Sequence, residues 1–393
     1  MARTYDTSTD FPYLAENDVY LDSACQSLRP QPVIDALNEY YTSYGSCGER
    51  VKYAWGVKVD KKIEETRELV LKYLKLRSKD YFVSFTLNTT YGINLILSQL
   101  KTDGIKKVMT SDIEHNSPFL ATIAFAEERD LPREVITRND DGSINLDDYD
   151  FTSALVVVNS ASNIDGRQLL NLKDLVKKVH KQGGLIVIDA AQAMAHMSEP
   201  LEKTEADAIC FSAHKMYAPS LGVIVARRDL LPRIKSSFIG GGMVDNVTGE
   251  TDYILSADSA NHAYTKFEAG LQAWGEIIAL STTIEWLMKA KKSSRVDEYA
   301  ERLFGALKDM AGVNLINTTP TPTISWYHDK IDAHLLSEAL SDQGIMTRSG
   351  YFCCHYYLSQ VKQYPPLIRM SLGLHSKETD IDRTIAVLQK LAK

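Results

Sequence analysis

A lysine stands where a buried strand of this sequence is expected to end, with a serine and a histidine just before it. The stretch ADAICFSAHKMYAPSLGVIVA, residues 206–226, contains two apolar runs of strand length, and Ser212, His214 and Lys215 lie between them. Lysine is rarely buried without a partner, because removing its charge from water is unfavourable. Its position therefore indicates either a specific ion pair or covalent chemistry at the amine.

Polar residues follow other apolar runs in the same way. They are Asn88 to Thr90, Glu114, His115, Ser162, Asn163 and Asp189. A lysine can form an imine with an aldehyde, a carboxylate can hold a protonated ring nitrogen, and a histidine can lie flat on a ring. Hydroxyl groups at a helix start, beside free N–H groups, suit a phosphate. Together these groups describe a site for pyridoxal phosphate (PLP), in which the lysine imine and the aspartate–pyridinium pair recur.

The elements that would position these residues alternate between helix and strand from about residue 50 to 230. Helical spacing covers 61–74, 89–100, 117–130 and 172–184, and continuous apolar runs of strand length cover 81–85, 106–111, 154–161, 184–191, 208–213 and 222–226. Strands buried on both faces and separated by helices predict a mostly parallel sheet with helices on both sides. Ligands of such sheets bind beyond the carboxyl ends of the strands, so the polar residues should meet at one edge.

The pattern changes after about residue 285. Residues 297–310 and 332–344 have helical spacing, and 320–327 and 367–374 are expected to be strands. The predicted fold class is therefore α/β, with a smaller α+β unit at the C-terminal end. We expect a large PLP-binding domain over 16–285 and a small domain over 286–393, which the N-terminal segment 1–15 joins.

Composition and charge exclude several classes of protein. The net charge of −7 gives no global support for nucleic-acid binding. No apolar run approaches the roughly 20 residues of a membrane helix, and the first residues lack the apolar core of a signal peptide. Five cysteines without a CxxC pair argue against a disulfide framework or a zinc site. We expect a cytoplasmic protein with reduced thiols, no metal and no membrane or nucleic-acid partner.

Several motifs together resemble the class V aminotransferase family of fold type I PLP enzymes, and within it the SufS-like cysteine desulfurases. They are DAAQA, FSAHKMYAPSLGVIVA, GGGMV, KFEAG and RSGYFC, and the resemblance extends from about residue 20 to RMSLGL. It implies the fold type I transferase architecture with a sheet of the seven-stranded type. It also implies conversion of L-cysteine to L-alanine, with a persulfide formed on the enzyme and passed to a sulfur acceptor.

The resemblance assigns roles around the cofactor. Lys215 would be the Schiff-base lysine, Asp189 would pair with the ring nitrogen, and His115 would stack on the ring and shuttle protons. Gln192 and Asn163 would contact the ring hydroxyl. The residues assigned to the phosphate are Thr89, Thr90, Ser212 and His214. Each residue could instead have a structural role. Lys215 could be a surface lysine of a loop, Asp189 and the two threonines could cap helices, and Gln192 could be an ordinary polar helix residue. Asn163 could form a turn, and His115 could be a structural histidine.

On the substrate side, the resemblance places Arg369 on the α-carboxylate, although a buried structural ion pair would also explain an arginine in an apolar strand. Arg348 opens the cysteine loop as a substrate-binding or loop-structuring residue. Cys353 would be the nucleophile and carry the persulfide. The spacing from Arg348 and Gly350 favours Cys353, while Cys354 stays open as a spectator, second carrier or nucleophile. Cys25, in LDSACQ, borders the site in the family but receives no role.

The sequence also departs from the family. Leu271 replaces a threonine expected to reach the phosphate of a partner subunit, so Thr265, water or a weaker phosphate site must compensate. Tyr351 and Phe352 stand where histidines often precede the cysteine. The resemblance implies a homodimer and a sulfur-acceptor protein, and it leaves iron–sulfur cluster assembly, tRNA thiolation and sulfur-carrier loading undecided. The alternatives are a C–S or selenocysteine lyase, an epimerase or an aminotransferase of the same family, or a non-catalytic scaffold.

Overall fold

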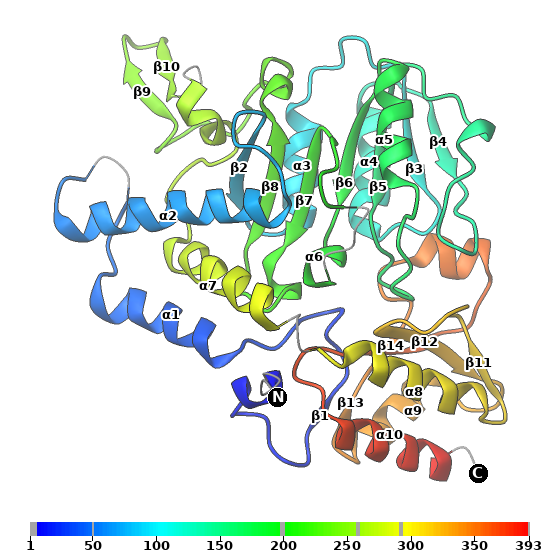
Figure 1. Ribbon diagram of the computed structural model, residues 1–393. Helices are drawn as coiled ribbons and strands as arrows, with labels where there is room; N and C mark the ends of the chain where they lie inside the picture. Colours follow the sequence, from blue (N-terminus) through cyan, green and yellow to red (C-terminus); the bar gives the residue numbers. More distant parts are fainter. Residues whose placement is uncertain (1–5, 49–50, 197–200, 257–259, 291–293, 392–393) are drawn as a thin grey trace.

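A seven-stranded sheet forms the centre of the larger part of the chain (Figure 1). The computed structural model describes residues 6–48, 51–196, 201–256, 260–290 and 294–391. The strand order is β2-β8-β7-β6-β5-β3-β4. In chain order the strands are β2 (Tyr81–Thr86), β3 (Lys107–Ser111), β4 (Arg133–Ile136), β5 (Ala154–Asn159), β6 (Leu185–Asp189), β7 (Ala208–Ser212) and β8 (Gly222–Arg227).

The predicted α/β class with a mostly parallel sheet is confirmed. Neighbouring strands from β7 to β4 pair in parallel, and β8 pairs antiparallel with both β7 and β2. The apolar run of β8 gave no indication of this reversal, because a strand buried on both faces reads the same in either direction.

Each central strand supplies side chains to two hydrophobic cores. In β5, Val156 and Val158 pack in one core and Leu155 and Val157 in the other. Each such side chain gains about 1.5–3 kcal/mol from full burial. Helices cover both faces of the sheet (Figure 1). One face is covered by α2 (Ala54–Tyr73), α5 (Leu172–Lys181) and α7 (Trp274–Ala290), and the other by α3 (Thr89–Gln99) and α4 (Asn116–Glu128).

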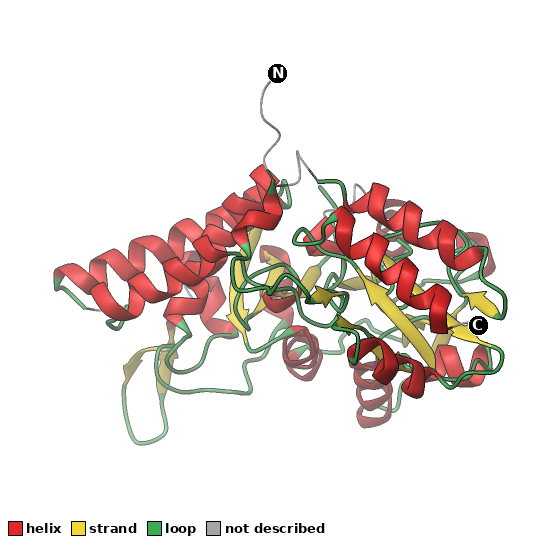
Figure 2. Cartoon of the chain, turned by 90° about the horizontal axis from the view of Figure 1, so that it is seen from below, coloured by secondary structure: helices red, strands yellow, loops and turns green. Residues whose placement is uncertain are grey.

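The C-terminal part contains a four-stranded antiparallel sheet with the order β11-β12-β15-β14. Figure 2 shows the last helix lying over the strands of this part. The elements are α8 (Val296–Lys308), β11 (Val313–Leu315), β12 (Thr323–His328), α9 (Ala333–Ser341), β13 (Ile345–Met346), β14 (Arg348–Gly350), β15 (Leu367–Ser371) and α10 (Glu378–Leu391). The α+β character expected of this region is confirmed.

The N-terminal segment packs against the C-terminal part. β1 (Val19–Tyr20) pairs in parallel with β13, and the hydroxyl of Thr7 donates a hydrogen bond of 2.5 Å to the carbonyl of Leu374. Helix α1 (Gln31–Ser43) then packs on α7. The domain boundary expected near residue 285 falls inside α7, which continues to Ala290, so the exact division of the chain stays a prediction.

A short helix and a two-stranded hairpin lie outside these two sheets. The short helix α6 (Ala193–His196) follows β6, and the strands β9 (Val244–Val247) and β10 (Tyr253–Leu255) form a hairpin that projects from the body in both views (Figures 1 and 2). Over the described ranges, no helix combines the length and apolar character needed to cross a bilayer.

Candidate active site

One cavity of about 290 Å³ lies at the carboxyl ends of the central strands, where the polar residues of the sequence were expected to meet. Every predicted site residue lines it: Thr89, Thr90, His115, Asn163, Asp189, Gln192, Ser212, His214, Lys215, Arg348, Cys353 and Arg369. Asn88, which was expected at the same sheet edge, also lines it. The lining further includes residues to which the sequence gave no site role, namely Ala24, Cys25, Ser117, Asn159, Ala161, Ala191 and Phe352. The structure therefore brings the predicted set together, while the individual roles stay predictions.

Lys215 reaches the cavity from a single helical turn, Ala213–Lys215, directly after β7. Burial lowers the pKa of its amine, and the nearby carboxylate of Asp189 partly opposes this effect. A lowered pKa increases the fraction of neutral amine, which is the nucleophilic form required to bind an aldehyde.

Asp189 is the last residue of β6 and only 5% exposed. Its carboxylate accepts a hydrogen bond of 2.8 Å from the backbone N–H of Ala191. Burial raises the pKa of the carboxyl group, and the Ala191 N–H and Lys215 lower it. A protonated ring nitrogen placed against this carboxylate would offset the desolvation, so the residue fits the pyridinium nitrogen of PLP.

His115 caps the start of α4. Its Nδ1 accepts a hydrogen bond of 3.0 Å from the backbone N–H of Ser117. Burial, together with the positive charges of Lys215 and Arg369, lowers the pKa of the imidazole to about 3. The ring is therefore neutral at physiological pH, and because Nδ1 is an acceptor its proton lies on Nε2.

The start of α3 forms a cradle suited to a phosphate. The side chain of Asn88 caps this helix by accepting from the N–H of Tyr91 at 2.9 Å. The hydroxyl of Ser212 accepts from the N–H of Thr89 at 2.9 Å and lies 2.7 Å from the Thr89 hydroxyl. The close approach of helix to sheet requires Gly222, where a Cβ would lie 2.5 Å from the Asn88 nitrogen.

Two further hydroxyl groups and an imidazole border the same cradle. The hydroxyls of Thr90 and Ser117 lie 2.6 Å apart, so Ser117 adds a phosphate-binding candidate that the sequence analysis missed. Ser117 lies in the first turn of α4, two residues after His115, and this position in the sequence could have indicated a phosphate-binding role. Burial, with the charges of Lys215 and Arg29, lowers the pKa of His214 to about 4, so this ring is neutral and can donate one N–H.

Asn163 connects the sheet edge to the cysteine loop. Its side-chain Nδ2 donates to the carbonyl of Phe352 at 2.7 Å, and its Oδ1 accepts from the thiol of Cys354 at 2.9 Å. The side chain is thus engaged by the loop, and its predicted contact with a cofactor hydroxyl stays a prediction. The Nε2 of Gln192 donates a hydrogen bond of 2.7 Å to the carbonyl of Ala24, and both residues line the cavity.

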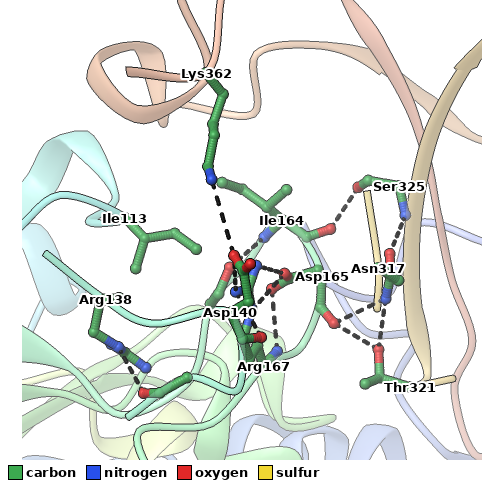
Figure 3. Close-up of polar contacts among 12 residues, drawn as sticks. Ile113, Arg138, Asp140, Ile164, Asp165, Arg167, Asn317, Thr321, Ser325 and Lys362 are labelled. Atoms are coloured by element: carbon green, nitrogen blue, oxygen red, sulfur yellow. Dashed lines mark hydrogen bonds and ion pairs between the residues drawn. The ribbon is translucent and has the colours of Figure 1, made fainter. Parts of the chain in front are cut away.

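The loop that carries Asn163 is itself fixed to the small sheet, as Figure 3 shows. The side chains of Asn317 and Thr321 donate to the carbonyl of Asp165 at 3.0 and 2.6 Å, and the hydroxyl of Ser325 donates to the carbonyl of Ile164. These bonds hold the position of Asn163 relative to the C-terminal part of the chain.

The two adjacent cysteines differ sharply in environment. Cys353 is exposed and lines the cavity, whereas Cys354 is fully buried and burial raises the pKa of its thiol. Phe352 and Cys353 both adopt left-handed backbone conformations, with φ of 48° and 58°. The backbone N–H of Asn116 donates to the Cys353 carbonyl at 2.6 Å. The geometry therefore favours Cys353 over Cys354 as the reactive thiol.

Arg369 is 2% exposed and lies on β15 with its guanidinium at the cavity wall. Its Nη2 donates to Asp22 at 3.0 Å and its Nη1 to the Asn163 carbonyl at 3.0 Å, while its Nε has no hydrogen-bond partner among the described residues. Arg348 donates to the same Asp22 carboxylate from Nε and Nη2, at 3.0 and 2.9 Å. We call Arg348, Asp22 and Arg369 the arginine clamp. Asp22, which was not among the predicted site residues, gives the clamp a net charge of +1.

Leu271 and Phe352, at which the sequence departs from the family, lie in different environments. Leu271 is 76% exposed, and the hydroxyl of Thr265 donates to the carbonyl of His262 at 2.8 Å inside the chain. Phe352 packs with its ring 4.8 Å from the Arg369 guanidinium carbon, a distance typical of a cation–π contact.

The chain is similar to known proteins in both sequence and structure. A family model described as aminotransferase class-V matches residues 19–384. The chain is 30% identical to a probable cysteine desulfurase of Haemophilus influenzae over 395 residues, covering 97% of this chain and 87% of that protein. It is 26% identical to a cysteine desulfurase of Escherichia coli, covering 97% and 96%. The apo cysteine desulfurase of Thermococcus onnurineus NA1 superposes with a TM-score of 0.89 and 25% identity, over 100% of this chain and 99% of that one.

Proposed function

Because the chain belongs to the class V aminotransferase family, we propose that it is a PLP-dependent cysteine desulfurase. The observation that carries the proposal is the exposed thiol of Cys353, which lines the same cavity as Lys215, Asp189 and the arginine clamp. The names of the similar proteins from Haemophilus influenzae and Thermococcus onnurineus support it.

The residues present fit PLP. Lys215 would bind its aldehyde, Asp189 its ring nitrogen and His115 its ring face, and Gln192 and Asn163 would lie at its hydroxyl. The groups suited to its phosphate are Thr89, Thr90, Ser117, Ser212 and His214. When bound, the group supplies an electron sink that weakens the bonds around the substrate's α-carbon.

The chain's own residues perform the remaining tasks. Arg369, with Arg348 beside it, binds the α-carboxylate, which suits the planar fork of a guanidinium. The amine of Lys215 and the neutral imidazole of His115 move protons at the reacting carbons. The thiolate of Cys353 takes the sulfur of the substrate, so that L-cysteine and the Cys353 thiol become L-alanine and a persulfide on Cys353.

Mass spectrometry after incubation with L-cysteine tests this function. We expect one added sulfur on Cys353, alanine in solution, and loss of both in Cys353→Ser but not in Cys354→Ser. The PLP-binding arm is tested by the visible absorbance of the purified protein, which Lys215→Ala should abolish. Release of sulfide or pyruvate at full rate by Cys353→Ser would instead establish a C–S lyase of the same family, and a protein that takes up no PLP would overturn both.

The proposal includes a homodimer. Leu271, Phe238 and Ile239 are exposed apolar side chains on the segment that follows β8, and the hairpin β9–β10 adds Val247, Tyr253 and Ile254. Such a concentration is typical of a surface that another chain covers. Analytical ultracentrifugation should give a dimer, and Leu271→Glu should weaken it.

The proposal also includes a protein acceptor for the sulfur and a reducing, cytoplasmic location. The backbone of Cys353 is tied to Asn116 and, through Phe352, to Asn163, so the thiol cannot travel far from the cavity. An acceptor must come to it. Turnover with a docking acceptor protein should therefore exceed turnover with a small thiol, and equal rates would contradict the idea. A thiol that must be reduced to act suits a compartment that keeps thiols reduced.

A further inference from the structure

A second cysteine faces the cavity that holds Cys353. Cys25 is partly exposed and lines the same space of about 290 Å³, together with Lys215, Arg348 and Arg369. None of the roles proposed above uses this thiol.

The backbone around Cys25 is held firmly against the site. The N–H of Cys25 donates to the carbonyl of Asp22 at 3.0 Å, which closes a turn around the carboxylate of the arginine clamp. Hydrogen bonds fix the turn to three residues that line the cavity and to β15. The Ala24 N–H donates to the Ser371 hydroxyl of β15 at 2.9 Å, and the Ala24 carbonyl accepts from the Gln192 amide at 2.7 Å. Ser27 donates from its N–H to the His214 carbonyl at 3.0 Å and from its hydroxyl to the Lys215 carbonyl at 2.5 Å. The thiol is thus presented to the cavity by a fixed wall.

Cys25 also lies close to the arginine clamp. Asp22 and, more weakly, Cys25 raise the pKa of Arg348. Arg348 and the buried Arg369 line the same cavity as Cys25, so two guanidinium side chains share the wall with this thiol. The thiolate is the reactive form of cysteine.

We propose that Cys25 is a second sulfur carrier, which receives the sulfane sulfur from Cys353 inside the cavity. The proposal rests on the proposed desulfurase function. The Cys25 thiolate attacks the outer sulfur of the Cys353 persulfide. A new bond forms between Cys25 Sγ and that sulfur, the bond from the sulfur to Cys353 Sγ breaks, and its electron pair returns to Cys353 as a thiolate. Nothing is oxidised or reduced overall, and the product is a persulfide on Cys25.

Regenerated Cys353 can then react with a second substrate molecule. Each chain would store a second sulfur before any acceptor arrives. In the absence of an acceptor, the burst of alanine should be about two per chain in the wild type and about one in Cys25→Ser, as expected of covalent intermediates that accumulate. The other cysteines lack this option: Cys354 and Cys210 are buried, and Cys47 is exposed but lies away from the cavity lining.

Mapping the sulfur tests the proposal directly. The holoenzyme is incubated with L-cysteine, alkylated, and cleaved before aspartates, which isolates residues 22–34 with Cys25 as their only cysteine. We expect sulfur on Cys25 in the wild type and none on Cys25 in Cys353→Ser. The matched control is Cys47, which should carry none. Sulfur on Cys353 without any on Cys25, or equal labelling of Cys25 and Cys47, would overturn the proposal.

A second measurement separates this proposal from the proposed function. If no sulfur reaches Cys353 from L-cysteine, the desulfurase proposal fails, and the thiols are instead loaded with inorganic polysulfide. Labelling of Cys25 that is greater in the wild type than in Cys353→Ser supports transfer between the two thiols. Equal labelling in both proteins overturns it.

Discussion

Replacement of Asp22 by alanine should destabilise the ligand-free protein far more than replacement of a surface aspartate. The Asp22 carboxylate lies 3.0 Å from Nη2 of Arg369, whose side chain is only 3% exposed. Without Asp22, that guanidinium keeps the Asn163 carbonyl as a partner but loses its counter-ion. Breaking a buried pair by removing one partner typically costs about 3–5 kcal/mol.

The expected loss is smaller than that range for two structural reasons. Asp22 itself is 14% exposed, so water screens part of the interaction, and Arg348 is 45% exposed and can be hydrated when its partner is removed. We therefore expect Asp22→Ala to lower the free energy of unfolding by about 2–4 kcal/mol. The control is Asp382→Ala, which removes the surface partner of Arg302 and should lower it by less than about 1 kcal/mol.

Urea unfolding without substrate measures both values. Adding Arg369→Met to Asp22→Ala should recover part of the lost stability, because the uncompensated buried charge is removed. Acetate should stabilise Asp22→Ala more than the wild type, since a free carboxylate can occupy the vacated place in the clamp. If Asp22→Ala and Asp382→Ala cost the same, or if acetate stabilises both proteins equally, the clamp is not the charge-balanced unit that its distances indicate.

Two other substitutions test the phosphate cradle and the buried histidine His375. Gly222→Ala should weaken PLP binding at least tenfold by spectroscopic titration, because its Cβ would lie 2.5 Å from the Asn88 nitrogen, whereas Gly305→Ala, with no atom near its Cβ, should leave binding unchanged. Burial lowers the pKa of His375 to about 4. Between pH 6.5 and 4, this residue therefore binds more protons in the unfolded chain than in the folded one. The free energy of unfolding should fall by about 1.4 kcal/mol for each unit that the pH is lowered through that window. His375→Gln, which can still donate to the carbonyl of Tyr20, should flatten the slope of the unfolding midpoint against pH, and an unchanged slope would contradict the assignment.

Most of the central sheet could be predicted because its strands are buried on both faces and read as continuous apolar runs. The direction of β8 was missed, although the sequence contained a signal for it. Only residues 213–221 separate β7 from β8, and a parallel crossover needs a dozen or more residues. The short connection therefore predicts that β8 runs antiparallel to β7 if the two strands are neighbours, whereas the composition of β8 gives no information on its direction.

The candidate site was predictable to the extent that its residues follow strand ends. Asp22 was not, because its role exists only through contact with Arg369, which lies 347 positions away in the chain. The same holds for the Asn163 side chain, whose partners Phe352 and Cys354 are brought to it by the fold. Local patterns identify which groups can react, but the charge balance and the support of a site come from long-range contacts that spacing does not encode.

The conformation of the cysteine loop limits how the sulfur transfer proposed for Cys353 can occur. Phe352 and Cys353 adopt left-handed backbone conformations that are unfavourable for residues other than glycine. The loop keeps them because Asn116 binds the Cys353 carbonyl and Asn163 binds the Phe352 carbonyl. Release of the thiol from the cavity would break both hydrogen bonds. Under the proposed function, a persulfide on Cys353 would therefore stay beside the cavity, and its sulfur would pass to a thiol that is brought to the loop or to Cys25, which lines the same cavity.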